Sequence, residues 1–289
     1  PATHGRTGLL RSLKRDEMAC CELADKGRTG VEVPLYMSYR SIFRILSGVL
    51  HVVGIIHFFF AAFYDVFATK VPVEVNPVYQ AWAGQFKFLT YWNVCLQAVY
   101  MSYAFGIDVF TLFNKNKKDE TTQKLVRFKD TVEASVALPI AMFVSFTFWG
   151  LMAVDRELVL PSKVDPYFPE WLNHMEHTNI IIFQLLELVT SPRVYPSNKV
   201  GLITLGVFQS SYLIWMHVVY YKSGIWVYPI FKQLTPPFRV LFLAGSVSTC
   251  FVFYFIGSFV NWFLWSGEKT KKEDDWEPVS TSQKAAIEP

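Results

Sequence analysis

Apolar residues fall in long blocks along this chain, and these blocks constrain the fold more than any other feature. A helix needs about 20 mainly apolar residues to cross a bilayer. Six blocks approach this pattern: Ile45–Phe67, Phe88–Phe113, Val132–Val154, His177–Val189, Gly201–Tyr221 and Val240–Trp265. Charged residues make up only 18% of the chain, below the quarter that is usual in soluble domains. The sequence therefore predicts an all-α, polytopic membrane bundle of six transmembrane helices.

The fourth block is the shortest and the most polar. Its core, Ile180–Val189, contains Gln184 and Glu187. Taken alone, such a segment is typical of a core helix in a soluble domain. Among five longer apolar blocks, we expect it to be a helix buried inside the membrane bundle.

The distribution of basic residues predicts the orientation of the chain. Twenty of the 27 Lys and Arg residues lie in the two terminal segments and in the connections after the second and fourth blocks. Basic residues concentrate on the cytosolic side of membrane proteins. Six spans place all of these segments on one side, so we expect both termini to be cytosolic. The net charge of +3 then reflects topology, and we expect no nucleic-acid partner.

Three regions follow from this pattern. Residues 1–41 mix charged and small residues without helical periodicity, and we expect a flexible cytosolic arm. Residues 42–266 form the predicted transmembrane domain. Residues 267–289 are predicted to be a disordered cytosolic tail, and nothing in the sequence indicates an oligomeric state.

Two predicted helices carry polar residues on one face each. In the second block, Gln97 lies about 20° around the helix from Thr90, and Asn93 lies about 60° from Thr90. In the fourth, Gln184 follows His177 by seven residues, so both lie on nearly the same face. Polar side chains inside a bilayer are costly and usually face the bundle interior. We therefore expect the two polar stripes to face partner helices.

Thr90 and His177 both lie near the beginning of their blocks, on the predicted non-cytosolic side. Each is within about 10 Å of that interface at 1.5 Å of rise per residue, so the two side chains can meet at similar depth. A hydroxyl beside an imidazole can perform acyl transfer, because the imidazole takes the hydroxyl proton during attack on an ester. Spacing alone is equally compatible with structural hydrogen bonds between helices.

A metal site is a further alternative at the level of spacing. His174 and His177 are three residues apart, with Glu170 and Glu176 nearby, and such a set can hold one zinc ion. The segment lacks the HExxH pattern of zinc proteases. Membrane di-iron enzymes use roughly eight histidines, whereas this chain has six. The sequence therefore gives a metal no positive support.

Several separated motifs resemble those of the androgen-induced gene 1 and androgen-dependent TFPI-regulating protein family. They are "QFKFLTYWNVCLQAVY", "VDRELVLPS", "FPEWLNHMEHTNIIIFQLLELVTSPRVYPS" and "GIWVYP", in this order. The resemblance implies a multi-pass membrane hydrolase of fatty acid esters of hydroxy fatty acids. It also implies that Thr90 is the nucleophile and His177 the catalytic histidine, with His174 in a supporting role, and that no cofactor is needed.

The resulting hypothesis is an intramembrane threonine esterase. Thr90 attacks the ester carbonyl and His177 acts as general base, then as acid, while Asn93, Asn173 or backbone amides hold the oxyanion. The expected partners are a branched lipid substrate and the bilayer of the plasma membrane or endoplasmic reticulum. The rival is a non-enzymatic lipid-binding regulator or transporter. A transporter is expected to carry an internal repeat, and none is evident in the sequence.

Overall fold

The computed structural model describes residues 35–114 and 119–275, with side chains for residues 42–114 and 119–265. The chain divides into two compact units at Phe43 and Arg44, and the description below concerns the second, Arg44–Pro289. Most of the predicted arm, residues 1–41, lies outside the described residues. The same is true of residues 276–289 of the predicted tail, while its first part continues the last helix.

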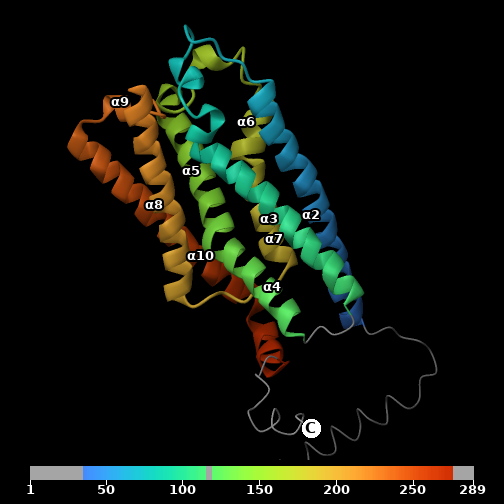
Figure 1. The fold of residues 1–289 in the computed structure, drawn as a ribbon. Coiled ribbons are helices and arrows are strands. Elements are labelled where there is room, and N and C mark those ends of the chain that lie inside the picture. The colour runs from blue at the N-terminus through green and yellow to red at the C-terminus, as the bar shows by residue number, and fades with distance from the viewer. Residues whose placement is uncertain (1–34, 115–118, 276–289) are drawn as a thin grey trace, which may run out of the picture. The chain divides into compact units, whose positions relative to one another are not determined.

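All regular secondary structure in the described part of the chain is helical, which confirms the predicted fold class. Five helices in it are long and apolar enough to cross a membrane. They are α2 (Leu35–Phe67), α3 (Leu89–Phe113), the continuous rod of α4 (Glu120–Val132), η3 (Glu133–Ala137) and α5 (Leu138–Asp155), α8 (Asn198–Ser223) and α10 (Pro236–Asp275). The chain runs back and forth along the bundle: α2, the α4–α5 rod and α8 run in one direction, and α3 and α10 run in the other (Figure 1).

The fourth apolar block, His177–Val189, and the segment before it fold as two shorter helices. These are α6 (Glu170–His177) and α7 (Asn179–Thr190), which follow one another in the same direction (Figure 1). Thr178 separates them with φ −110° and ψ −55°. Gln184 and Glu187 are fully buried, so this segment lies inside the bundle as its polar residues predict. Neither helix is long enough to span a bilayer alone, and the count of six spans stays a prediction.

Helix α5 packs at the centre of the bundle, against α3, α6, α7 and α10 (Figure 1). Its buried positions, which include Ile140, Ala141 and Val144, lie on several faces, as expected for a helix surrounded by others. The π-helical turn η3 precedes it. Pro139 cannot donate to the Ser135 carbonyl and would crowd it in a regular α-helix, so a wider turn at this point relieves the conflict.

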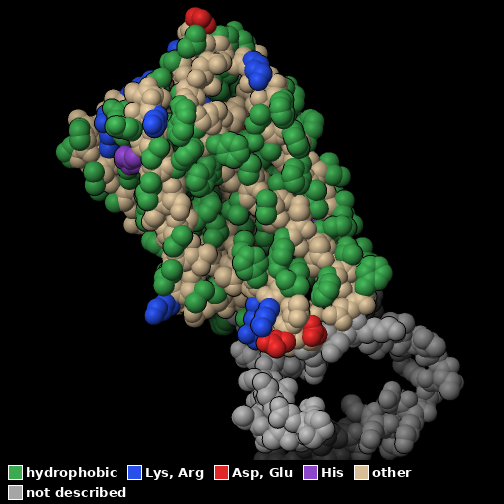
Figure 2. Space-filling view, viewed as in Figure 1, with side chains coloured by type: hydrophobic (Ala, Val, Ile, Leu, Met, Phe, Trp, Pro, Cys, Tyr) green, Lys and Arg blue, Asp and Glu red, His purple; other side chains and the backbone are tan. Residues whose placement is uncertain are grey.

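The outer surface of the bundle is apolar along the length of the helices. Figure 2 shows hydrophobic side chains over most of the visible face, with charged side chains gathered toward the helix ends. Exposed residues on α2 include Ile45, Ile56 and Phe63, each more than half exposed. An apolar surface of this extent is unstable in water and stable against lipid tails. The structure is thus that of an integral, multi-pass membrane protein.

A buried ionic cluster away from Thr90 joins four helices, α2, α3, α4 and α7. His51 of α2 contacts Asp108 of α3 through Nδ1 at 2.6 Å and Glu187 of α7 through Nε2 at 3.0 Å. The Tyr100 hydroxyl donates to Glu187 at 3.0 Å, and Lys129 lies 3.8 Å from the same carboxylate. Charged groups inside a membrane bundle persist where they are paired. This cluster accounts for Glu187 in the fourth apolar block.

Short helices cover the end of the bundle at which α3 and α6 begin. They are η1 (Pro77–Gln80), η2 (Gly84–Lys87), η4 (Arg156–Leu158), η5 (Ser162–Val164) and α9 (Ile230–Gln233). Helix η2 begins after Ala83, whose φ of 79° is left-handed, and its own first residue, Gly84, has φ 52°. This sharp turn brings Phe88 directly to the start of α3, and so determines where Thr90 lies.

Candidate active site

Thr90 and His177 meet in the folded protein. Thr90 is the second residue of α3, and His177 is the last residue of α6. The Thr90 Oγ1 atom lies 3.2 Å from His177 Nε2, within hydrogen-bonding distance. The residues are 87 positions apart, so only the packing of α3 against α6 brings them together. The two side chains lie at similar depth, as the sequence predicts.

The backbone fixes the tautomer of His177. Its Nδ1 atom lies 3.1 Å from the carbonyl oxygen of Asn173, which can only accept a hydrogen bond. In the neutral ring, Nδ1 therefore carries the hydrogen, and the Nε2 lone pair faces the Thr90 hydroxyl. The ring also stacks on Phe148, with centroids 3.6 Å apart and planes 19° apart. The imidazole is thus held in the orientation that a general base requires.

The start of α3 supplies hydrogen-bond donors beside Thr90. The first amides of an α-helix have no carbonyl partner within the helix, and they lie at its positive end. Phe88 precedes α3 in an extended conformation, and its side chain does not cap the helix. The amides of Thr90 and Tyr91 belong to this first turn. Such amides stabilise the negative charge that develops on a carbonyl oxygen during acyl transfer.

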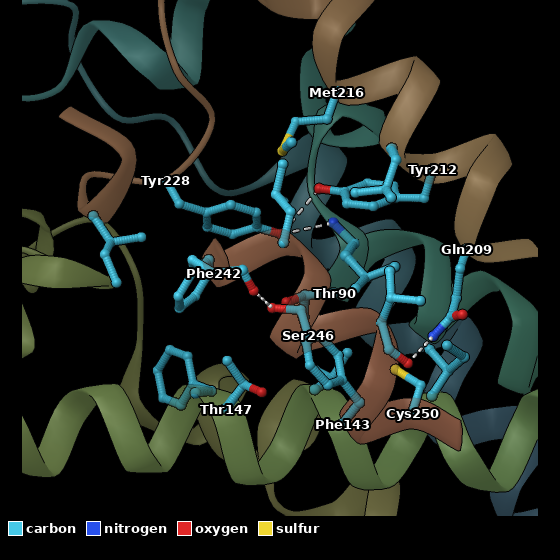
Figure 3. Close-up of a pocket in the computed structure, with 18 of the residues that line it drawn as sticks. Thr90, Phe143, Thr147, Gln209, Tyr212, Met216, Tyr228, Phe242, Ser246 and Cys250 are labelled. Atoms are coloured by element: carbon cyan, nitrogen blue, oxygen red, sulfur yellow. Dashed lines mark hydrogen bonds between the residues drawn. The ribbon is translucent and has the colours of Figure 1, made fainter. Parts of the chain in front are cut away.

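Two tyrosines anchor this first turn. The Leu89 amide donates to the Tyr228 hydroxyl at 2.9 Å, and the Tyr212 hydroxyl donates to the Lys87 carbonyl at 3.0 Å. The two hydroxyls lie 3.1 Å apart, so Tyr228 donates to Tyr212 and closes a continuous chain (Figure 3). Tyr212 comes from α8 and Tyr228 from the connection before α9. The chain fixes the backbone on both sides of Phe88.

Thr90 lines a large apolar cavity. The empty volume of this cavity is about 850 Å³, and its walls come mainly from α5, α8 and α10. Apolar groups such as Phe143, Met216 and Phe242 surround Thr90 in Figure 3. Cavities of several hundred Å³ with apolar walls and few polar groups are typical of small-molecule sites. This cavity suits a hydrocarbon chain.

A second, smaller cavity meets the first at Thr90. It has an empty volume of about 510 Å³, and Thr90, Phe148, Val159 and Tyr228 line both cavities. Its other walls are more polar, with Asp65, Tyr79, Gln85, Glu176 and His177 among them. Thr90 therefore lies at a boundary between an apolar space and a polar one.

Two charged residues at or near the smaller cavity, Asp65 and Lys87, are buried. Asp65 accepts a hydrogen bond from Gln85 Nε2 at 2.9 Å, and its side chain is almost inaccessible. Lys87 is fully buried, and its Nζ donates to the Gly84 carbonyl. Burial lowers the pKa of Lys87 to about 8, although the nearby charge of Asp65 opposes the shift. Burial raises the pKa of Tyr79, and the charges of Asp65 and Glu176 raise it further.

His174 takes a different place from His177. Its side chain is 46% exposed, its Nδ1 lies 2.9 Å from Thr178 Oγ1, and its ring stacks on Trp149 at 5.3 Å. The Trp149 indole also donates to Thr178 Oγ1 at 3.1 Å. His174 thus holds the break between α6 and α7, and it lines neither cavity. A supporting role for it stays a prediction.

Asn93 belongs to a buried chain of amides. Gln184 Nε2 donates to Gln97 Oε1 at 2.6 Å, and Gln97 Nε2 donates to Asn93 Oδ1 at 3.1 Å and to the Ala137 carbonyl at 3.0 Å. The two predicted polar stripes therefore face each other across the bundle. Asn93 does not line either cavity around Thr90, and its supporting role at the oxyanion stays a prediction.

The two histidines of the "HMEH" segment point to different partners, Thr90 for His177 and Thr178 for His174. Among the residues that the structure describes, no group of three or more His, Cys, Asp or Glu side chains has a geometry for holding a metal ion. The four residues that the spacing offered as zinc ligands, His174, His177, Glu170 and Glu176, do not form such a group.

Sequence reasoning did not assign Asp65, Phe148 or Tyr228 to the site, and it named Glu176 only as a possible zinc ligand. Tyr228 lies in the "GIWVYP" motif and Glu176 in the "HMEH" segment, so quoted motifs contained two of them. Their approach to Thr90 depends on how the connections fold over the bundle. Local sequence carries no signal for that arrangement.

Comparison with known proteins places the chain in a family. A family model described as FAR-17a/AIG1-like protein matches residues 46–262, which is most of the chain. The chain belongs to this family. Human androgen-induced gene 1 protein is 31% identical over 206 residues, covering 70% of this chain and 87% of the relative. Mouse androgen-dependent TFPI-regulating protein is 36% identical over 184 residues, covering 63% and 78%. No solved structure matches.

Proposed function

We propose that this FAR-17a/AIG1-like protein is an intramembrane lipid esterase that hydrolyses fatty acid esters of hydroxy fatty acids. One observation carries the proposal: the Thr90 hydroxyl contacts a buried, oriented imidazole where an apolar cavity meets a polar one. The first-turn amides of α3 supply the remaining element of an acyl-transfer site. The protein acts in the plasma membrane or endoplasmic reticulum without a metal or organic cofactor.

The first half of the reaction forms an acyl-threonine. His177 Nε2 takes the proton from Thr90 Oγ1 as that oxygen attacks the ester carbonyl. The amides of Thr90 and Tyr91 stabilise the oxyanion of the tetrahedral intermediate. When the intermediate collapses, the bond to the hydroxy fatty acid oxygen breaks, and that oxygen takes the proton from His177. The acyl group is then attached to Thr90.

The second half releases the acyl group. A water molecule attacks the acyl carbonyl, and His177 takes one of its protons. The bond to Thr90 Oγ1 breaks, and His177 returns the proton to that oxygen. The products are a fatty acid and the free threonine. The Asn173 carbonyl holds the His177 Nδ1 hydrogen throughout, and so stabilises the imidazolium that forms in each half.

The apolar cavity is the proposed site of the transferred acyl chain. Its walls come mainly from three membrane helices, and Thr90 of α3 is one of its few polar groups. A substrate dissolved in the bilayer already lies at the depth of these helices. The rival function, lipid binding by a non-enzymatic regulator or transporter, would use the same cavity without the Thr90 hydroxyl.

The test uses purified full-length protein and a defined branched fatty acid ester. We expect Thr90→Ala to reduce hydrolysis by about a thousandfold or to background, and His177→Gln by about a hundredfold or more. Thr90→Ser keeps a hydroxyl and should retain activity within roughly tenfold of wild type.

Thr249→Ala is the matched control, because the Thr249 hydroxyl is exposed and donates only to the Gly245 carbonyl in its own helix. Hydrolysis that survives in Thr90→Ala would refute the esterase mechanism, and lipid binding without hydrolysis in wild type would favour the rival. Loss of activity with EDTA and recovery with zinc would favour a metal enzyme.

A further inference from the structure

Glu176 has an unusual environment for a carboxylate. It directly precedes His177 at the end of α6, is only 3% exposed, and lines the smaller cavity. Its Oε1 atom is buried and has no hydrogen-bond partner among the described residues. A buried acceptor without a partner costs about 1–3 kcal/mol. A group that carries such a cost next to a candidate general base requires an explanation.

Three further polar groups line the same cavity. Asp65 comes from α2, Gln85 from η2 and Tyr79 from η1, so they reach it from separate elements. Gln85 Nε2 donates to Asp65, while Gln85 Oε1 is also buried and has no partner in the described part of the chain. Because the pKa of Tyr79 is raised, its hydroxyl keeps its proton and stays a donor. These groups offer both acceptors and a donor.

The cavity is suited to hold water. A bound water typically makes 2–4 hydrogen bonds to buried polar groups, and it occupies about 30 Å³ in the liquid. The space in this cavity, part of which is open to solvent, is about 510 Å³, and Thr90 and His177 are among the residues that line it. The larger cavity has almost entirely apolar walls, and in the proposed reaction the acyl chain fills it. The hydrolytic water must therefore approach from the smaller cavity.

We infer that Glu176, together with Asp65, binds and orients the water that hydrolyses the acyl-threonine. The inference rests on the proposed function and assigns these carboxylates to its second half alone. Glu176 accepts one hydrogen of the water while His177 Nε2 takes the other as the water oxygen attacks the acyl carbonyl. The attack breaks the bond from the carbonyl carbon to Thr90 Oγ1, which regains a proton from His177.

Acylation does not require Glu176. His177 contacts Thr90 directly, and the Asn173 carbonyl already sets its tautomer. The described structure shows no hydrogen bond from the Glu176 side chain to Thr90 or His177. Replacing its carboxyl group with an amide therefore slows the step that uses water and spares the step that uses Thr90. A carboxylate that merely supports the fold would affect both steps.

The two steps separate in a burst experiment on the full-length protein in lipid nanodiscs. The probe is the p-nitrophenyl ester of a long-chain fatty acid, whose release of nitrophenolate reports acylation. In Glu176→Gln we expect the burst rate to stay within about threefold of wild type. We expect steady-state turnover to fall by at least about tenfold, and intact mass to show accumulated acyl-protein. Asp65→Asn should act in the same direction.

Glu74→Gln is the control, because Glu74 is exposed, lies in the connection that also carries Tyr79 and Gln85, and lines neither cavity. Its burst and turnover should match wild type. Glu176→Gln protein that melts at the wild-type temperature but loses burst and turnover equally would overturn the inference, as would unchanged turnover. Neither result contradicts the proposed function. That function fails instead if Thr90→Ala retains the burst and the turnover of wild type.

Discussion

Tyr228→Phe tests whether the tyrosine chain positions the start of α3. The Tyr228 hydroxyl accepts from the Leu89 amide at 2.9 Å and pairs with Tyr212 at 3.1 Å. Phenylalanine leaves the amide without its acceptor, which costs about 1–3 kcal/mol, and also removes the donor to Tyr212. Together these losses predict a decrease of about 2–4 kcal/mol in the free energy of unfolding.

Tyr212→Phe leaves the Lys87 carbonyl without its donor, while the Leu89 amide keeps Tyr228 as its acceptor, so it should cost about 1–3 kcal/mol. The double variant should lose about 1 kcal/mol less than the sum of the two single variants, since both remove the same hydroxyl pair. Tyr221→Phe is the control, because Tyr221 is 84% exposed and its change should lie within about 0.5 kcal/mol.

The same variants affect catalysis through Thr90. Thr90 directly follows Leu89, so a shift in the first turn of α3 moves its hydroxyl relative to His177. A displacement of about 1 Å can cost about a hundredfold in rate, and Tyr228→Phe should lose between about tenfold and a hundredfold of kcat/KM.

Unfolding is followed in mixed detergent micelles and hydrolysis in nanodiscs. Tyr228→Phe protein as stable and as active as Tyr221→Phe would refute the claim that this chain holds the site.

Three further variants test other parts of the structure. His51→Leu leaves Glu187 buried without its ring partner, and should cost about 3–5 kcal/mol in the free energy of unfolding; a loss below 1 kcal/mol would contradict the burial of this cluster. Gly257→Ala places a methyl group 2.7 Å from atoms of two side chains, whereas the methyl group of Gly245→Ala meets nothing within 4 Å. In the unfolding assay, Gly257→Ala should therefore be less stable than Gly245→Ala by about 1–3 kcal/mol. The pKa of Lys87 is lowered from 10.5 to about 8, so between these pH values the unfolded chain binds more protons than the folded one, and the free energy of unfolding should rise with pH. Lys87→Met should remove this pH dependence. The same slope in the variant and in wild type would refute the assignment of the slope to Lys87.

The apolar blocks predicted much of the fold because membrane spans leave a long and regular signal. Helices α3 and α8 coincide with single predicted blocks to within a few residues at both ends. Helices α2 and α10 coincide with single blocks at one end, and each extends beyond its block at the other end, α2 at its start and α10 at its finish. The rod of α4, η3 and α5 starts well before the predicted Val132, because α4 (Glu120–Val132) is polar and amphipathic and carries no block of its own. Hydropathy does not detect such a helix.

The contact between Thr90 and His177 was predictable for a different reason. Topology and rise per residue fixed the depth of both side chains, and the polar stripes fixed the faces that point inward. The break at Thr178 was not predictable, because it depends on the hydrogen bonds that Trp149 and His174 make to its hydroxyl. The carboxylates of the smaller cavity also escaped prediction, since they come together only when separate connections fold over the bundle.

The most direct test of the central claim is to identify the residue that carries the acyl group during turnover. Acid quenching of the wild-type protein with a branched fatty acid ester, followed by peptide mass spectrometry, should find the acyl group on Thr90. The adduct should be absent from Thr90→Ala and strongly reduced in His177→Gln, while Thr249→Ala should show it at the wild-type level. Hydrolysis that proceeds without any adduct on Thr90, and at the same rate in Thr90→Ala, would contradict the account.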